Sequence, residues 1–95
     1  MAASSGLLII QLHLPEAHTL KDKRQVLQSL LGRLKARLNV AVAETGHQDF
    51  HQRAEISLAC VAGTRLGCDR ILDDALALVE FQPRAVVLSA EREVS

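Results

Sequence analysis

The spacing of apolar residues switches along this chain from a period of two to a period of about 3.6 and back, and it does so twice. Period two predicts strands, and the longer period predicts helices. In chain order, the predicted elements are a strand at 6–14, a helix at 19–38, strands at 40–46 and 53–61, a helix at 64–81 and a strand at 86–91. Thr19 and Thr64 are suited to cap the two helices, and Pro83 stops the second.

This order is typical of the α+β class and of the ferredoxin-like split βαβ fold (βαββαβ), in which two helices cover one face of a four-stranded antiparallel sheet. A length of 95 residues suffices for one hydrophobic core. We therefore expect a single domain at residues 6–93. A flexible tail at residues 1–5 should precede it, and residues 93–95 should fray.

The second face of the predicted sheet has no helix over it. Alternation assigns to this open face Leu7, Ile9, Gln11, His13, Ala41, Ala43, Arg53, Glu55, Ser57, Ala59, Val61 and Val87. A surface this apolar usually meets a partner, most simply a second copy of the chain. The residues expected at such an interface are Leu7, Ile9, His13, Val61 and Val87.

Charge is balanced overall but not along the chain. The net charge is +0, yet residues 1–48 carry six basic and three acidic residues, and residues 49–95 carry five and eight. This balance argues against a general polyanion binder, so we expect no DNA binding, although it leaves room for a local basic face. No apolar run reaches the roughly 20 residues that cross a bilayer, and no signal-peptide pattern is present, so we expect a cytoplasmic protein without membrane contacts.

Three cations gather where the first strand gives way to the first helix. Lys21, Lys23 and Arg24 surround Asp22 at a helix start, where free amides and the helix dipole attract anions. This pattern indicates a contact with phosphate or with an RNA backbone. Alternatively, Asp22 satisfies the dipole, and the cations are solvated or paired with acids of the second helix.

Basic residues continue along the first helix. Residues 19–38 hold six basic side chains and one acidic side chain, whereas residues 64–81 hold two and four. Two adjacent helices would present a basic ridge beside an acidic ridge. Such a surface suits docking on a protein or on an edge of ribosomal RNA, and complementary helix faces within one domain explain it equally well.

Residues that could bind a metal or carry catalysis are few. His47, Asp49 and His51 have a spacing that zinc accepts, but they lack a second ligand pair and fit an ordinary polar hairpin loop. No nucleophile motif or phosphate-binding loop occurs. We therefore expect no metal, no cofactor and no catalytic residue, although the sequence alone does not exclude an enzyme.

Other polar and thiol side chains have structural explanations. His13 with Glu55, or Glu44 with Arg53, could act as acid and base, but cross-strand pairing explains both pairs. The two cysteines, Cys60 and Cys68, fall within apolar patterns and lack CxxC spacing. We therefore expect them to be buried free thiols.

The aromatic content excludes RNA recognition on the open sheet face. Sheets of this architecture that recognise RNA usually stack its bases on aromatic rings. The chain has two phenylalanines and no tryptophan or tyrosine, and neither Phe50 nor Phe81 falls on an open-face position. Any RNA contact would have to involve cations of a helix or a loop.

Four segments are distinctive: HLPEAHTLKDKR at 13–24, LLGRL at 30–34, NVAVAE at 39–44 and QDFHQRA at 48–54. Together they resemble the bacterial YlxP-like family, a domain family of unknown function, and the resemblance extends from about residue 6 to residue 92. It implies a ferredoxin-like fold in a bacterial cytoplasmic protein. Family members are often encoded beside genes for transcription termination, translation initiation and ribosome maturation, which implies a role linked to RNA or the ribosome. His51 departs from the family, whose members commonly have tryptophan there.

The residues and the resemblance together favour a small non-enzymatic binding module that docks on ribosomal RNA or on a translation-linked protein. The expected contacts are Lys21, Lys23, Arg24, Lys35, Gln48, Asp49 and Arg53. The alternatives are a self-associating protein-interaction domain that uses the open sheet face, and a small-ligand binder or enzyme.

Overall fold

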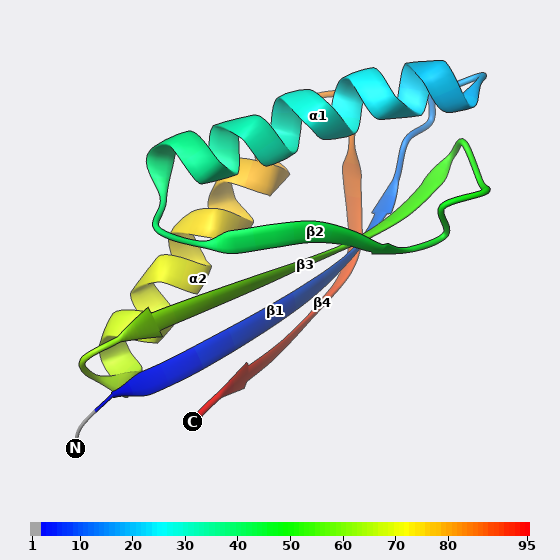
Figure 1. The fold of residues 1–95 in the computed structure, drawn as a ribbon. Coiled ribbons are helices and arrows are strands. Elements are labelled where there is room, and N and C mark those ends of the chain that lie inside the picture. Colours follow the sequence, from blue (N-terminus) through cyan, green and yellow to red (C-terminus); the bar gives the residue numbers. More distant parts are fainter. Residues whose placement is uncertain (1–2) are drawn as a thin grey trace.

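The computed structural model describes residues 3–95 and confirms the predicted order of elements. In chain order, the elements are β1 (Ser4–His13), α1 (Leu20–Arg37), β2 (Ala41–Gly46), β3 (Arg53–Ala62), α2 (Arg65–Glu80) and β4 (Val86–Val94) (Figure 1). The strands form one sheet in the order β2-β3-β1-β4, and every neighbouring pair is antiparallel. This arrangement is the ferredoxin-like βαββαβ fold.

Both helices lie on the same face of the sheet and leave the other face open (Figure 1). β1 and β3 occupy the centre, and their residues alternate between the two sides. Leu8, Ile10 and Leu12 of β1 are buried beneath the helices, whereas Leu7 and Ile9 face the open side. The apolar residues on both faces of this segment therefore correctly predicted a central strand.

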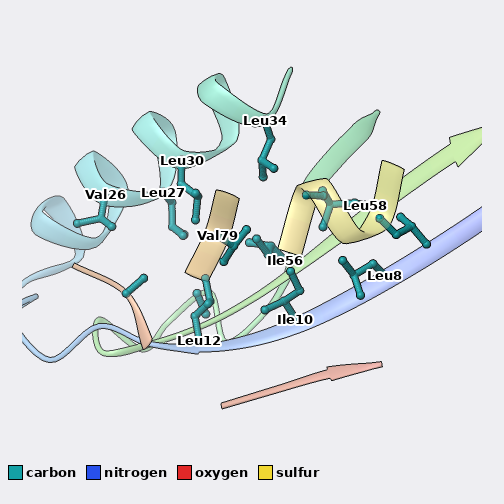
Figure 2. Close-up of a cluster of buried hydrophobic side chains, with 14 of the residues drawn as sticks. Leu8, Ile10, Leu12, Val26, Leu27, Leu30, Leu34, Ile56, Leu58 and Val79 are labelled. Atoms are coloured by element: carbon teal, nitrogen blue, oxygen red, sulfur yellow. The ribbon is translucent and has the colours of Figure 1, made fainter. Parts of the chain in front are cut away.

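The core fills the space between the helices and the sheet. Figure 2 shows Leu30 and Leu34 of α1 pointing toward the sheet, where Ile10 and Ile56 lie, with Val79 of α2 beside them. All five side chains are fully buried, and each such burial stabilises the fold by about 1.5–3 kcal/mol relative to exposure. Because the leucines recur at helical spacing, α1 lies with one stripe against the sheet.

Threonine caps begin both helices, as the sequence predicts. The Thr19 hydroxyl oxygen accepts a hydrogen bond from the Asp22 amide at 3.1 Å, and the Thr64 hydroxyl oxygen accepts one from the Gly67 amide at 2.9 Å. Each bond satisfies an amide that the helix itself leaves without a partner. The first cap thereby fixes where the basic turn of α1 lies.

The ends of the chain are more ordered than the sequence indicates. Instead of a tail at residues 1–5, β1 begins at Ser4, which is buried. Ser5 N–H donates to the Ser95 carbonyl at 3.1 Å, and Ser95 N–H donates to the Ser5 carbonyl at 2.9 Å. This mutual pair also orders residues 93–95, for which fraying is expected. Residues 1–2 of the expected tail lie outside the described residues.

A bulge in β4 reverses the faces of its first residues. Leu88 is an extra residue between the positions paired with Gln11 and Leu12 of β1. Val87 consequently lies opposite Leu12 and packs against the core, so the assignment of Val87 to the open face is wrong. Val86, which is 48% exposed, takes the open-face position instead.

Replacing each of these valines by threonine tests the bulge, since threonine keeps the shape and strand preference of valine. We expect Val87→Thr to lower the free energy of unfolding by about 1–2 kcal/mol, because its hydroxyl loses water beneath the helices. Val86→Thr should change it by less than about 0.5 kcal/mol, because its hydroxyl stays in solvent. Urea denaturation measures both values, and equal losses would show that Val87 is not turned inward.

Candidate functional site

Three exposed cations lie along one side of α1, and we call them the outer stripe: Lys21, Arg24 and Lys35. At 3.6 residues per turn, they fall within about 60° of one another around the helix axis, on a side that faces solvent. No ion pair within residues 3–95 joins any of them to an acidic side chain. The outer stripe is therefore an uncompensated line of positive charge.

Asp22, the one acid of α1, is engaged by the backbone. Its Oδ2 accepts a hydrogen bond from the His18 N–H at 3.0 Å, and this bond, helped by the Thr19 hydroxyl, holds the pKa of Asp22 below its usual value. The carboxylate is thus ionised at neutral pH and stabilises the helix start, as one of the two sequence interpretations holds. Within residues 3–95, Asp22 forms no ion pair with a cation of the outer stripe.

Lys23 does not belong to the exposed basic turn. The residue is 2% exposed, and its Nζ lies 2.8 Å from Glu44 Oε2. The ammonium also donates to the carbonyl oxygens of His47 at 2.6 Å and Phe50 at 2.8 Å. Two loop carbonyls therefore accept hydrogen bonds from the ammonium, and one carboxylate balances its charge, which together offset the loss of water around a buried cation. Lys23 cannot serve as the partner contact that the sequence predicted, and it pairs with β2 rather than with the second helix.

The Lys23 ammonium holds the β2–β3 loop against the start of α1. His47 has a left-handed backbone (φ 57°), and the Phe50 N–H donates to the His47 carbonyl at 3.0 Å. Both carbonyls that bind the ammonium therefore lie in one tight turn. Figure 1 shows this loop beside the N-terminal end of α1, so the exposed residues Gln48 and Asp49 lie at the same end of the molecule as the start of the outer stripe.

Arg53 directly follows the β2–β3 loop but takes an open-face position of the sheet. It begins β3 opposite His13 and is partly exposed on the open face. The two acid-base pairs considered from the sequence do not form: Glu44 binds Lys23, and His13 Nδ1 lies 3.2 Å from the Gln52 carbonyl oxygen. Arg53 therefore belongs to the open face rather than to the loop surface.

The acids of α2 form no ion pair with the cations of α1 within residues 3–95. Among residues 3–95, the ion pairs of α2 run to β4 instead: Arg92 Nη1 lies 2.8 Å from Asp73 Oδ1 and 3.3 Å from Asp69 Oδ1. No ion pair therefore joins the two helix faces within residues 3–95, although Asp74 of α2 lines the same groove as Arg33 and Arg37 of α1. The basic side of α1 is left facing solvent.

The open sheet face carries the other predicted interface. Leu7, Ile9, His13 and Val61 lie on it, with Leu7 36% and Val61 67% exposed. A shallow hollow of about 610 Å³ includes Leu7 and Val61, and smaller hollows adjoin it over the neighbouring strands. An apolar, hollowed face differs from an ordinary solvated surface.

Polar side chains on the open face bond one another across strands. Glu55 Oε2 accepts a hydrogen bond from the Thr45 hydroxyl at 2.6 Å, and Glu55 Oε1 accepts one from Gln11 Nε2 at 2.7 Å. These two bonds, the Thr45 bond first, lower the pKa of Glu55. Glu55 is therefore an ionised acceptor in a cross-strand network and is not poised to donate a proton.

A groove between the two helices was not foreseen from the sequence. It has a volume of about 390 Å³, and its lining includes Arg33, Arg37, Asp74 and Phe81. Phe81 follows the last turn of α2 and is 82% exposed. One feature of the sequence could have indicated this groove. Phe81 lies after the apolar stripe of the second helix and before Pro83, so its ring is not required to fill the core.

The metal-binding and thiol candidates are explained by their surroundings. No three His, Cys, Asp or Glu side chains within residues 3–95 are grouped to hold a metal ion, so His47, Asp49 and His51 form no such site. Cys60 and Cys68 are buried and unpaired, as predicted, and burial raises the pKa of the Cys60 thiol.

Neither helix of the described chain has the length and apolar character needed to traverse a bilayer.

Replacing Lys23 by methionine tests the role of its ammonium. Methionine keeps the aliphatic stem, but Glu44 loses its counter-ion and two loop carbonyls lose their donor, so we expect the free energy of unfolding to fall by about 3–5 kcal/mol. Urea denaturation measures the loss, and faster amide hydrogen exchange at residues 48–51 would report the released loop. Lys21→Met is the matched control and should stay within about 0.5 kcal/mol of the wild-type value. A similarly small change for Lys23→Met would contradict the assigned role.

Solved structures that share the fold include two with TM-scores above 0.5. De novo designed protein Foldit4 superposes with a TM-score of 0.56 at 12% identity, covering 97% of this chain and 96% of that one. A C-terminal segment of the alpha subunit of aIF2 from Pyrococcus abyssi superposes with a TM-score of 0.52 at 12% identity, covering 95% of this chain and 49% of that one. At this level of identity, the two similarities show the fold alone.

Sequence comparison identifies the family. The family described as "Protein of unknown function (DUF503)" matches residues 6–92. Uncharacterized protein YlxP of Bacillus subtilis (strain 168) is 35% identical over 68 residues, which cover 72% of this chain and 74% of that protein. Because the family match spans nearly the whole described chain and agrees with the similarity to YlxP, this chain belongs to the YlxP-like DUF503 family.

Proposed function

We propose that this protein is a small non-enzymatic module that docks on ribosomal RNA through the outer stripe and the neighbouring β2–β3 loop. The observation that supports it most is the state of the α1 cations. Lys21, Arg24 and Lys35 are exposed on one side of the helix and have no acidic partner within residues 3–95. Cations in this state can contact phosphate oxygens without first breaking an internal ion pair.

The spacing of the outer stripe fits an extended anion better than a single one. At 1.5 Å of rise per residue, Lys21 and Arg24 are about 4.5 Å apart along the helix axis, and Lys35 lies about 16 Å beyond Arg24. One phosphate group cannot span that distance, whereas a polynucleotide carries a charge on every nucleotide. The stripe therefore favours RNA over a small phosphorylated ligand.

The β2–β3 loop adds polar groups to the cationic stripe. Gln48 can both donate and accept hydrogen bonds, which suits sugars and base edges. Asp49 would repel a phosphate, but it can accept a hydrogen bond from a ribose 2′-hydroxyl or from a base. Because Lys23 fixes this loop, the contact surface is formed before binding, which lowers the ordering cost of association.

The opposite side of the molecule restricts how RNA approaches. Glu91 and Glu93 of β4 lie opposite Ile9 and Leu7 on the open face, and both are exposed. No ion pair within residues 3–95 neutralises them. A polyanion is therefore attracted to the α1 side and repelled from the sheet side, so a net charge of +0 is compatible with oriented binding.

Charge reversal on the outer stripe tests this function. In gradients of cell extract, tagged wild-type protein should co-sediment with ribosomal subunits at low salt and be released at high salt, because phosphate contacts displace counterions. The variant Lys21→Glu with Arg24→Glu should bind isolated ribosomal RNA at least about tenfold more weakly, because two attractions become repulsions. Filter binding at several salt concentrations measures the affinities.

The control makes the same charge change at the start of α2, away from the start of α1 (Figure 1). Arg65→Glu with Arg70→Glu reverses two exposed cations and gives the same net charge as the stripe variant. Retained binding in the control, with loss in the stripe variant, supports the proposed surface. Equal affinities of the stripe variant and the wild-type protein would refute that surface. Wild-type protein that stays at the top of every gradient would refute ribosome docking.

Self-association through the open sheet face is a second candidate, favoured by the apolar hollow there. Arg53 and His13 lie at one end of the strands, whereas Glu91 and Glu93 lie toward the other. A second copy inverted end for end would place opposite charges together around an apolar centre. The occupant of this face is thus proposed to be a second copy of the chain.

Sedimentation equilibrium at high micromolar concentration tests the second candidate. The wild-type protein should dimerise, and Leu7→Glu with Val61→Glu should give monomers, because two carboxylates would lose water at the centre of the contact. Strictly monomeric wild-type protein would rule the candidate out. The outer stripe lies on the helix side of the sheet, so the substituted protein should keep its affinity for RNA.

A further inference from the structure

The groove between α1 and α2 brings together groups that the outer stripe and the loop do not use. Figure 1 shows the C-terminal turns of α2 approaching α1, whereas the start of α2 lies far from it. The groove measures about 390 Å³, and its lining includes Arg33 and Arg37 of α1, Asp74 and Leu78 of α2, and Phe81. It combines positive charge, one carboxylate and an exposed aromatic ring.

Phe81 is the most exposed of the large hydrophobic residues in the described chain, at 82%. Its backbone N–H donates to the Ala77 carbonyl at 3.0 Å, so the ring is attached to a well-formed helix end. The ring contributes little to the core and leaves its faces open to a flat ligand. An exposed ring on a rigid element is typical of a contact site.

Arg33 and Arg37 supply positive charge beside the ring. They are four residues apart and therefore lie on the same flank of α1, toward α2. Within residues 3–95 neither forms an ion pair, even with Asp74, which lines the same groove. Guanidinium groups bind phosphate through paired N–H bonds and also stack on flat rings.

We propose that this groove is a nucleotide site for single-stranded RNA, in which one base stacks on Phe81 and the adjoining phosphate binds Arg33 and Arg37. The inference rests on the proposed function and deepens it, since the outer stripe holds backbone while the groove holds a base. Stacking on an exposed ring requires an unpaired base, so the ligand class is single-stranded rather than duplex RNA.

Asp74 favours a nucleotide over an acidic peptide, the other ligand that two arginines attract. A carboxylate in the groove repels acidic side chains, but it accepts hydrogen bonds from the amino group of a base. Adenine, cytosine and guanine carry such an amino group, and uracil does not. We therefore expect the groove to prefer an amino-bearing base over uracil.

A sequence without tryptophan permits a direct fluorescence test. Phe81→Trp introduces a single tryptophan and keeps a ring for stacking, so titration with a pentamer of oligoadenylate should quench its emission. Leu66→Trp is the matched control, because Leu66 is also exposed, at 59%, but lies at the start of α2. Both substitutions are at exposed positions, and circular dichroism verifies that the proteins fold.

We expect quenching of Phe81→Trp and none of Leu66→Trp. In anisotropy titrations with labelled pentamers, Phe81→Ala should weaken binding by about five- to hundredfold, the range that loss of one stacked base produces. Arg33→Ala with Arg37→Ala should weaken it as well and make it less sensitive to salt. Asp74→Ala should lower the ratio of oligoadenylate to oligouridylate affinity, because the acceptor for the amino group is lost.

The possible failures are distinguishable. If pentamers bind the wild-type protein and reversal at Lys21 and Arg24 weakens them, but Phe81→Trp is not quenched at saturation, the groove site is overturned and the proposed function stands. If no RNA binds the wild-type protein, both the groove site and the proposed function are refuted. Stronger quenching by an oligoglutamate of equal charge than by oligoadenylate would also overturn the nucleotide site and assign the groove to a protein ligand.

Discussion

The buried ammonium group of Lys23 is the interaction on which one end of the molecule depends. It joins α1, which carries the lysine, to Glu44 at the end of β2 and to the loop carbonyls of His47 and Phe50. A charge removed from water needs a full set of partners, so none of these segments can move away without leaving a polar group unsatisfied. The loop beside α1 is therefore held in place by the helix itself, and the surface that the two share has a defined shape.

The same requirement separates structural charges from those that face solvent. Lys23 and Arg92 are committed to internal partners, whereas the outer stripe and the groove arginines have no acidic partner among residues 3–95. The sheet side, by contrast, exposes carboxylates on β4. A chain with no net charge thereby acquires a basic α1 surface and an acidic sheet edge, and this polarity can orient a charged partner without strong long-range attraction.

The features that the sequence predicted correctly are those set by residues close together in the chain. The strands, the helices and both threonine caps depend on residues within a few positions of one another. The inward turn of Val87 depends instead on the bulge at Leu88, and the register of pairing with β1 is not encoded in alternation. Lys23 did carry a signal, because it precedes Leu27 and Leu30 by four and seven residues and so lies on the buried stripe. Its acceptors could not be identified, since they come from segments that only the tertiary fold brings together.

The mutual hydrogen bonds of Ser5 and Ser95 make the folded chain close to a closed ring. Figure 1 shows the start of β1 and the end of β4 at the edge of the molecule remote from the β2–β3 loop. A linker of a few residues could join them, and the chain could then be opened at an exposed turn while the order of the strands in the sheet is kept. By the same geometry, a protein fused or immobilised through either end would present the start of α1 outward, away from the attachment point.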